Sequence, residues 1–448
     1  METARSNIAS PLTVPASRSD AAPAPDVRRI TSRHQAPQPV LAYIAGQFPK
    51  RSETFVYREV RLLRERGWTV HCLSLRESPD AASQEFADLI DNMTTVYGRV
   101  GVATFARGVK EMIQHPIASL RLLYTAMKDA ITPKEKMSLT GRAKLLPQAM
   151  AAMGVSRHLR AIGVTHIHAH FAHAPATLAM YTARHMGVSF SFTGHANDLF
   201  QRRALLKRKL SRAMFVACIS QWHRQYYGTL KVDLLGKYHV IRCGVDVAGW
   251  SPKSPMRVEP GVLHVLGVGR LVEKKGFDTL LRACHQLIDV RRRACHLTIA
   301  GDGEDRARLE DLAESLGITQ HVTWLGAVRN DRVQDLLGRA DVFALPCRTD
   351  ARGDKDGIPV VLMEAMARGV PAISGDFPAI RELIEHGHDG LIVGPDDFVL
   401  LAEHLIRLDT DEPERLRLAA AGRARVVEEF SLDMNVARLE EALLNKLA

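Results

Sequence analysis

Short apolar runs alternate with amphipathic helical segments along most of the chain, and glycine-rich or polar loops separate them. In the first half, an apolar run at 40–45 leads into a loop at Gly46, a helical pattern over 54–66 and a second apolar run at 69–75. This strand–helix–strand order predicts a parallel sheet. A long helical pattern then fills 100–153. Further strands are predicted at 166–170, 189–193, 214–219 and 239–241, with a helix at 175–186.

A second alternating series follows the proline-containing segment 246–260, which is typical of a linker. Strands are predicted at 263–268, 296–300, 321–325, 342–345, 371–374 and 390–393, with helices at 277–290, 304–316, 333–339, 360–368, 379–386 and 412–429. We therefore expect an α/β chain with two Rossmann-like lobes, whose ligands bind at the carboxyl ends of the strands. The amphipathic tail 431–448 predicts a helix that either caps the second lobe or crosses back to the first.

Length and composition are those of a globular protein with two domains, since 448 residues exceed what one compact core usually holds. Residues 1–39 are rich in Ala, Pro, Ser and Arg, which predicts a disordered lead-in and not a secretory signal. The six cysteines form no C-x-x-C pair, which favours a reducing cytoplasm over a zinc or disulfide framework. The net charge of +10 indicates an anionic partner of unspecified kind: nucleic acid, a lipid leaflet or a phosphorylated substrate.

Two glycine-containing loops follow strands of the second series. The sequence G-V-G-R-L-V-E-K-K-G at 267–276 places Arg270 and Lys275 beside the start of a helix. Two cations and a helix N-terminus together suit a diphosphate, although the loop alone also fits a solvated basic turn. The sequence A-G-D-G at 300–303 puts Gly303 on the same rim, or forms a simple capped turn.

The most specific pattern is D-G-I-P-V-V-L-M-E at 356–364. Asp356 precedes a predicted helix, and Gly357 and Ile358 are expected to offer backbone N–H groups to a phosphate or a sugar. Glu364 stands in an apolar stretch, and a buried carboxylate requires a partner. A ribose-binding role is therefore predicted for Glu364, with a partly exposed surface glutamate as the alternative.

Histidines gather at the strand ends of the first series. His195 follows the strand at 189–193, where it could bind a sugar hydroxyl, polarise a leaving phosphate or act structurally. His166, His168 and His170 alternate along one strand, with His173 after it. Because the sequence shows no carboxylate or cysteine beside them, no metal site is predicted.

Taken together, these segments resemble the family 4 retaining glycosyltransferases of the GT-B fold, in which two Rossmann-like lobes face each other across a cleft. The matching motifs are G-R-L-V-E-K-K-G at 269–276, A-G-D-G at 300–303, D-G-I-P-V-V-L-M-E-A-M-A at 356–367 and R-E-L-I-E-H-G-H-D-G at 381–390. The sequence F-P-K-R-S-E-T-F at 48–55 is similar to the subgroup that builds exopolysaccharides of the colanic-acid type. The resemblance implies that lobe 40–245 binds the acceptor and lobe 261–430 the nucleotide sugar.

The resemblance also implies a role for each matching residue. Arg270 and Lys275 would bind the donor diphosphate and stabilise the departing nucleotide. Glu364 would hold the ribose, and Asp356 stands where the family has a longer acid near the donor sugar. The remaining donor contacts would come from Gly46, Gly303, Val328, Gly357 and Ile358, and His195 would lie near the transferred sugar.

The implied function is retaining transfer of a hexosyl group from a UDP- or GDP-linked sugar to a lipid-linked or polysaccharide-precursor glycan, with no required metal or cofactor. The acceptor would lie at the cytoplasmic face of the membrane, which makes a basic run a candidate membrane contact, or else a solvated helix face. This run consists of Arg202, Arg203, Lys207, Arg208 and Lys209.

Two other functions fit the same two lobes. One is a non-catalytic sugar-nucleotide-binding protein. The other is a nicotinamide-dependent oxidoreductase, although no G-x-G-x-x-G follows the first strand. Nucleic-acid binding is not expected, because aromatic residues make up only 6% of the chain and do not interleave with the basic ones.

Overall fold

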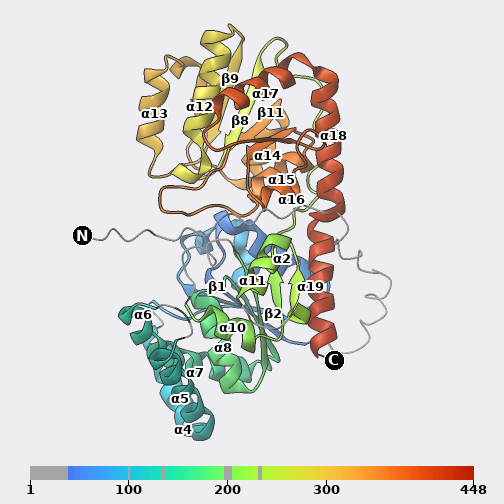
Figure 1. Cartoon of the computed structure of the whole chain (residues 1–448). Helices are drawn as coiled ribbons and strands as arrows, with labels where there is room; N and C mark the ends of the chain where they lie inside the picture. Colours follow the sequence, from blue (N-terminus) through green and yellow to red (C-terminus); the bar gives the residue numbers. More distant parts are fainter. Residues whose placement is uncertain are drawn as a thin grey trace, which may run out of the picture.

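Two parallel sheets, each covered by helices, form two lobes (Figure 1). This architecture comes from a computed structural model that describes residues 39–98, 101–133, 135, 137–195, 204–230 and 235–447. The predicted α/β class with two Rossmann-like lobes is confirmed. The proposed disordered segment, apart from its last residue Pro39, lies outside the described residues.

The N-terminal lobe contains a seven-stranded sheet in the described part of the chain, in the order β3-β2-β1-β4-β5-β6-β7. Its strands are β1 (Leu41–Gln47), β2 (Val70–Arg76), β3 (Met93–Thr95), β4 (His166–His170), β5 (Ser189–Gly194), β6 (Val216–Cys218) and β7 (Tyr238–Val240). The order reverses between β1 and β4, so the loops after these two strands flank the switch point, where α/β sheets bind ligands.

The C-terminal lobe contains a sheet with the order β10-β9-β8-β11-β12-β13 over the described residues. Its strands are β8 (Leu263–Val268), β9 (Cys295–Ala300), β10 (Val322–Trp324), β11 (Val342–Leu345), β12 (Ala372–Gly375) and β13 (Leu391–Val393). β11 is buried throughout, as expected for a parallel strand covered on both faces. Here the switch point lies between β8 and β11.

Helices cover both sheets. In the N-terminal lobe these include α2 (Thr54–Glu65), α4 (Gly101–Gln114), α5 (Pro116–Ile131), α6 (Leu139–Ala143), α7 (Leu145–Ala161), α8 (Ala174–Met186), α10 (Leu206–Arg212) and α11 (Gln221–Thr229). The C-terminal lobe carries α12 (Phe277–His285), α13 (Arg306–Ser315), α14 (Asn330–Arg339), α15 (Val360–Ala367), α16 (Ile380–Leu383) and α17 (Phe398–Thr410). The helix predicted over 379–386 is thus only four residues long, and α17 was not predicted.

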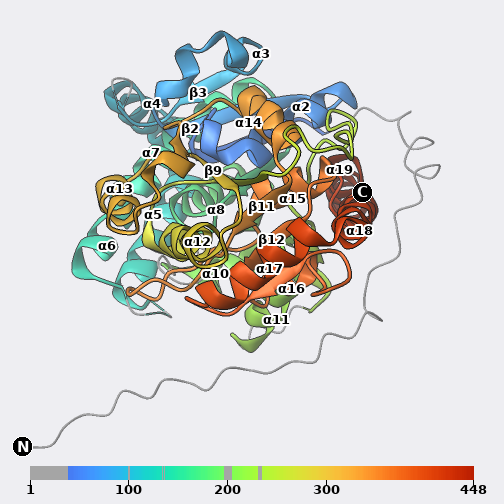
Figure 2. The same ribbon diagram turned by 90° about the horizontal axis from the view of Figure 1, so that it is seen from above.

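Two helices at the end of the chain connect the lobes. α18 (Glu412–Glu429) lies on the C-terminal lobe, and α19 (Leu432–Leu447) runs along the N-terminal lobe (Figures 1 and 2). The apolar side of α19 is buried in one cluster with β1 and α2, including Leu439 and Leu443. Trp68 donates its indole N–H to Glu440 of α19 at 2.7 Å. Of the two positions considered for the tail, it adopts the one that crosses to the first lobe.

The two crossings between the lobes lie side by side. Val245, where the chain leaves the N-terminal lobe, donates its backbone N–H to Phe430 at 2.9 Å, and Leu432 donates to the Val245 carbonyl at 2.8 Å. A Cβ atom added at Gly244 would lie 2.4 Å from the Cα of Leu432. The chain therefore passes between the lobes at a single tightly packed place.

Candidate active site

The loops after β8 and β11, on either side of the switch point, are joined by half-buried ion pairs. Lys275 Nζ lies 2.7 Å from Asp356 Oδ2, and Lys274 Nζ lies 3.0 Å from Asp356 Oδ1. Lys274 also contacts Asp354 at 2.9 Å. Two lysines and two acids from separate loops therefore meet where a parallel sheet binds its ligands.

The charge of this cluster is stable over a wide pH range. Burial by itself raises the pKa of Asp356, but the ammonium groups of Lys275 and Lys274 outweigh burial and lower that pKa to about 2. Burial lowers the pKa of Lys275, yet the Asp356 carboxylate outweighs it and raises that pKa. Lys275 and Asp356 therefore both remain ionised near neutrality.

The loops after β8 and β9 approach each other so closely that only glycine fits. A Cβ atom at Gly301 would lie 1.8 Å from the Gly269 carbonyl, and one at Gly303 would lie 2.3 Å from the Leu271 carbonyl. Gly301 donates its backbone N–H to Gly326 at 2.7 Å, which brings the segment containing Val328 next to these loops. Arg270 is exposed on the first of them. The predicted residues Arg270, Lys275, Gly303 and Val328 thus stand on adjoining loops of one sheet edge.

Glu364 faces the other lobe. Its carboxylate is 4% exposed, and Arg58 of α2 donates to its Oε1 at 3.0 Å. The sequence correctly indicated a buried carboxylate that needs a partner. The partner is a guanidinium from the N-terminal lobe, so any hydroxyl that binds Glu364 has to share the carboxylate with Arg58.

The described residues include a small pocket between the lobes. Its walls are Trp222 and His223 of α11, Lys355, Asp356 and Gly357 before α15, and Phe377, Pro378 and Ala379 before α16. Next to it, Glu382 accepts hydrogen bonds from the backbone N–H groups of Gln221 and Trp222, both at 2.8 Å. Asp356 and Gly357 therefore border an interlobe space, while Ile358 packs against the core of the C-terminal lobe.

On the N-terminal side, His195 ends a chain of buried polar groups. His195 Nε2 lies 3.3 Å from His170 Nδ1, and His170 Nε2 lies 3.0 Å from Glu59 Oε1. Tyr43 donates a short hydrogen bond to the same glutamate oxygen. Burial moves the pKa of His195 well below its ordinary value, so the imidazole is neutral at pH 7. Gly46, at the end of β1, has open space on its Cβ side.

The remaining β4 histidines are structural. His166 contacts Ser189 and Ser191 at 2.7 Å each, and His168 contacts Ser191 at 2.7 Å and Thr193 at 3.0 Å. Both rings are completely buried. Burial lowers the pKa of His166 to about 3, so the ring is a neutral hydrogen-bonding group. The alternation along β4 therefore pairs with a matching alternation of hydroxyls along β5.

Several residues of the site were not singled out from the sequence. Lys274, Arg58 and Glu59 acquire their roles from contacts across 80 to 306 positions of the chain, which no local pattern reports. One premise was wrong. A carboxylate does lie beside the β4 histidines, since ligand atoms of Glu59, His168 and His170 lie within 4.8 Å of one another. The absence of a required metal therefore stays a prediction.

The predicted basic membrane contact needs a correction. Lys209 is completely buried and donates to the carbonyls of Ala172, His173 and Ala204. Arg208 is buried and pairs with Asp129 of α5 at 2.9 Å. Both side chains find their partners inside the lobe, so they present no positive charge to a membrane. Arg202 and Arg203 lie outside the described residues, and Lys207 is half-buried.

Both lobes match known family models. Residues 52–248 match the model "Glycosyltransferase Family 4", and residues 258–425 match "Glycosyl transferases group 1". These matches follow the two lobes seen in the structure. The chain belongs to the glycosyltransferases of the GT-B fold, with a family 4 domain followed by a group 1 domain.

Several relatives of this chain carry names from exopolysaccharide biosynthesis. The amylovoran biosynthesis glycosyltransferase AmsK of Erwinia amylovora is 36% identical over 47% of this chain and 51% of its own length. The putative colanic acid biosynthesis glycosyltransferase WcaL of Escherichia coli is 40% identical over 39% and 44%. The chain thus spans about half the length of these two curated relatives. The WcaL protein of Salmonella typhimurium is 29% identical over 87% of this chain and 96% of its own.

Solved structures agree on the fold. A sucrose-phosphate synthase from Thermosynechococcus elongatus superposes with a TM-score of 0.68 over 92% of this chain and 99% of its own, at 18% identity. The Anabaena protein HepE, solved with UDP-glucose, gives 0.66 over 90% and 99%, at 15% identity. Within the described residues no helix is both long and apolar enough to cross a bilayer.

Proposed function

We propose that this chain transfers a hexosyl group from a nucleoside-diphosphate sugar to a glycan acceptor, with retention of the anomeric configuration. In the reaction, the bond between the sugar C1 and the diphosphate oxygen breaks, and the acceptor hydroxyl oxygen bonds to C1. The hydroxyl proton passes to the leaving diphosphate. The proposed acceptor is a lipid-linked or polysaccharide-precursor glycan at the inner face of the cytoplasmic membrane.

The observation that carries the proposal is the cluster of Lys274, Lys275 and Asp356 at the switch point of the C-terminal lobe. A diphosphate there would receive fixed positive charge from Lys275, from Lys274 and from the exposed Arg270. Such charge stabilises the departing nucleotide most strongly in the transition state, because the negative charge on the leaving oxygen develops there. We assign Glu364 to the ribose and the segment containing Val328 to the base.

We assign His195 to a hydroxyl of the transferred sugar. A neutral imidazole accepts or donates a hydrogen bond without placing a charge beside a sugar C1 that is becoming positive. Glu59 is a first-lobe carboxylate close to His195, but its Oε1 already accepts from Tyr43 and His170. We therefore give Glu59 the task of orienting His170, and propose substitution from the same face of the sugar without a glycosyl-enzyme intermediate.

The relatives support the choice of substrate class. A mannosyltransferase of Mycobacterium tuberculosis, described as GDP-mannose-dependent and acting on phosphatidylinositol monomannoside, is 35% identical over 45% of this chain and 54% of its own length. The amylovoran and colanic acid relatives are named for exopolysaccharides. A GDP- or UDP-linked hexose and a lipid-linked or polymer-precursor glycan are consistent with all three names.

A donor panel tests the proposal. Thermal unfolding of the full chain is measured with UDP- and GDP-linked hexoses, because a ligand that binds the folded state raises the melting temperature. Release of the nucleoside diphosphate is then followed with the stabilising donor, with and without a lipid-linked glycan fraction. Acceptor-dependent release supports transfer. Stabilisation without any release in either condition identifies a non-catalytic binder and contradicts the proposal.

Retention is tested on the product. With an α-linked donor, the anomeric proton of the new glycosidic bond should show the coupling of an α-linkage in NMR. A β-linked product would overturn the same-face mechanism while leaving the transferase assignment intact.

A further inference from the structure

Helices α4 and α5 bury mainly small and polar residues and expose large apolar ones, which is the opposite of an ordinary surface helix. The residues that α4 buries are Thr104, Gly108 and Glu111, and those of α5 are Ser119, Leu122, Thr125, Ala126 and Asp129. The exposed residues are large and apolar: Val102, Phe105, Val109 and Ile113 on α4, and Ile117, Leu120, Tyr124, Met127 and Ile131 on α5. Steps of three or four residues keep each set on one face of its helix. We call these residues the α4–α5 apolar face.

Backbone packing explains why the apolar side chains remain outside. A Cβ atom at Gly154 of α7 would lie 2.0 Å from the Thr104 carbonyl, and one at Gly108 would lie 2.6 Å from the Met150 carbonyl. α4 and α7 therefore touch backbone to backbone, with no room for a large side chain between them. Figure 1 shows α4 and α5 at the end of the N-terminal lobe remote from the C-terminal lobe, so the α4–α5 apolar face is not an interface between the lobes.

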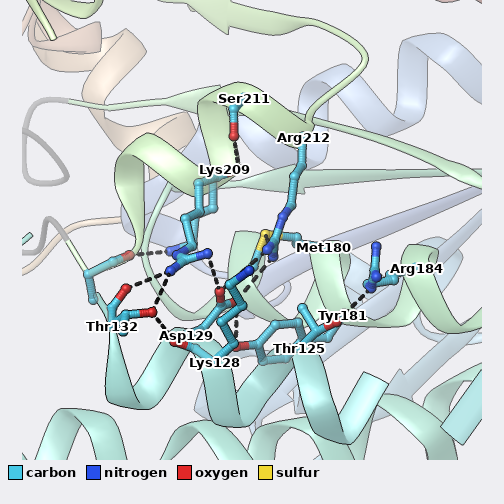
Figure 3. Close-up of polar contacts among 12 residues, drawn as sticks. Thr125, Lys128, Asp129, Thr132, Met180, Tyr181, Arg184, Lys209, Ser211 and Arg212 are labelled. Atoms are coloured by element: carbon cyan, nitrogen blue, oxygen red, sulfur yellow. Dashed lines mark hydrogen bonds and ion pairs between the residues drawn. The ribbon is translucent and has the colours of Figure 1, made fainter. Parts of the chain in front are cut away.

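The acids of this region point inward. Glu111 is 1% exposed and pairs with Arg160 of α7 at 3.1 Å. Asp129 is completely buried and pairs with Arg208 and with Arg212, the latter at 3.1 Å (Figure 3). These pairs anchor the polar side of the hairpin to α7 and α10.

The cations of this region point outward. Arg107, Lys110, Arg121, Lys128 and Lys144 are all exposed. Their charge is not offset by an exposed acid among the described residues of 101–144, where Glu111 and Asp129 are buried and Glu135 is half-buried. At helical spacing Lys110, Arg121 and Lys128 flank the large apolar residues, whereas Arg107 lies on the side of α4 that faces His158 of α7. Positive charge therefore borders the exposed apolar residues of both helices.

We infer that the α4–α5 apolar face inserts into the interfacial layer of a bilayer that contains anionic lipids. A helix face that combines large apolar side chains with flanking lysine and arginine binds at this depth, through apolar burial and attraction to lipid phosphates. The exposed cations favour this occupant over a second copy of the chain, because a symmetric dimer would bring the same cations of both copies together. The membrane contact is then made by α4 and α5 instead of the α10 cations, and it does not depend on the proposed reaction.

Vesicle sedimentation of the full chain tests the inference. The wild-type chain should bind vesicles of phosphatidylcholine mixed with phosphatidylglycerol, and more weakly those of phosphatidylcholine alone. The variant Ile113→Gln/Ile117→Gln/Leu120→Gln should lower the partition coefficient by about tenfold or more. These side chains are 73%, 66% and 65% exposed, so their replacement should leave the melting temperature unchanged.

Two further variants separate the apolar and charged contributions. The matched control Met256→Gln/Val258→Gln/Val399→Gln removes apolar residues that are 75%, 60% and 52% exposed elsewhere, and should bind vesicles like the wild type. The variant Lys110→Gln/Arg121→Gln/Lys128→Gln should lose about fivefold in vesicle affinity per cation, on anionic vesicles only.

Failure of the wild-type chain to bind anionic vesicles would overturn the inference, and so would an equal loss of binding in the matched control. Analytical ultracentrifugation gives a third test. The inference is wrong if the chain forms a dimer that the Ile113→Gln/Ile117→Gln/Leu120→Gln variant dissociates while vesicle binding is unaffected. Because vesicle binding is measured without donor or acceptor, its failure is distinct from a failure of the proposed reaction.

Discussion

The two lobes share a parallel-sheet architecture, but their polar groups differ in charge. In the C-terminal lobe, Lys274, Lys275 and Asp356 form a largely enclosed cluster of ionised groups. In the N-terminal lobe, burial holds neutral both His195, which follows the carboxyl end of β5, and the structural residues His166 and His168 inside β4. The same sheet topology can therefore hold ionised lysines for a diphosphate in one lobe and a neutral histidine for a sugar in the other.

The Arg58→Ala substitution should have the largest effect, because Arg58 and Glu364 join the two regions across the cleft. Its loss leaves a carboxylate that is 4% exposed without this counter-ion. Breaking a buried ion pair by removing one partner typically costs about 3–5 kcal/mol of stability. Thermal unfolding should show a clear decrease in melting temperature.

The double variant Arg58→Ala/Glu364→Gln is the matched control, since it removes the charge as well as its partner and should recover most of the lost stability. A melting temperature of Arg58→Ala equal to that of the wild type would show that Glu364 does not depend on the other lobe.

The Lys275→Ala substitution tests the charged region directly. It should lower turnover by about 10²–10³-fold, the range seen when one group that stabilises developing negative charge is removed. The fold should survive, because Asp356 keeps Lys274 as a partner at 3.0 Å. The comparison variant Arg292→Ala removes a cation whose side chain is 82% exposed and should leave turnover unchanged. Wild-type turnover of Lys275→Ala would refute the role of this cluster.

The neutral region predicts a smaller, pH-dependent effect. Because the pKa of His166 falls to about 3 on folding, the unfolded state binds a proton that the folded state does not between about pH 6.5 and pH 3. Its contribution to stability is present above pH 6.5 and is lost as the pH falls through this window. The His166→Gln variant should reduce the slope of unfolding free energy against pH by about 1.4 kcal/mol per unit near pH 5.

Urea unfolding at a series of pH values measures that slope. The Ser189→Ala variant serves as the control, because it removes a hydrogen bond to His166 without removing a titrating ring. It should change the stability at each pH but leave the slope intact. An unchanged slope in His166→Gln would mean that this ring titrates alike in both states.

Local patterns predicted the fold well where a strand is buried on both faces. The apolar runs at 263–268 and 342–345 coincide with β8 and β11, and the run at 166–170 coincides with β4. The sequence was less informative where the burial of a side chain depends on tertiary packing. The charged run at 207–209 has the pattern of a solvated helix face, yet Lys209 is buried because backbone carbonyls of another loop surround its ammonium group.

The candidate site was predictable in its local parts only. The motifs identified Lys275 and Asp356, and the structure joins them. The partnership of Glu364 with Arg58 spans 306 positions, and the approach of Glu59 to His170 spans 111, so neither leaves a periodic trace in the sequence. Contacts of this kind depend on how the lobes and layers meet, which is a property of the folded chain as a whole.

The paired crossings at Val245 and Leu432 constrain how the cleft can open. Since both connections run through one packed spot, a rigid rotation of one lobe against the other has its hinge there and little freedom to slide. The distant end of the cleft then travels farthest for a given angle, while the groups close to the hinge hardly move. We therefore expect any rotation between the lobes to take place about a single axis at this crossing.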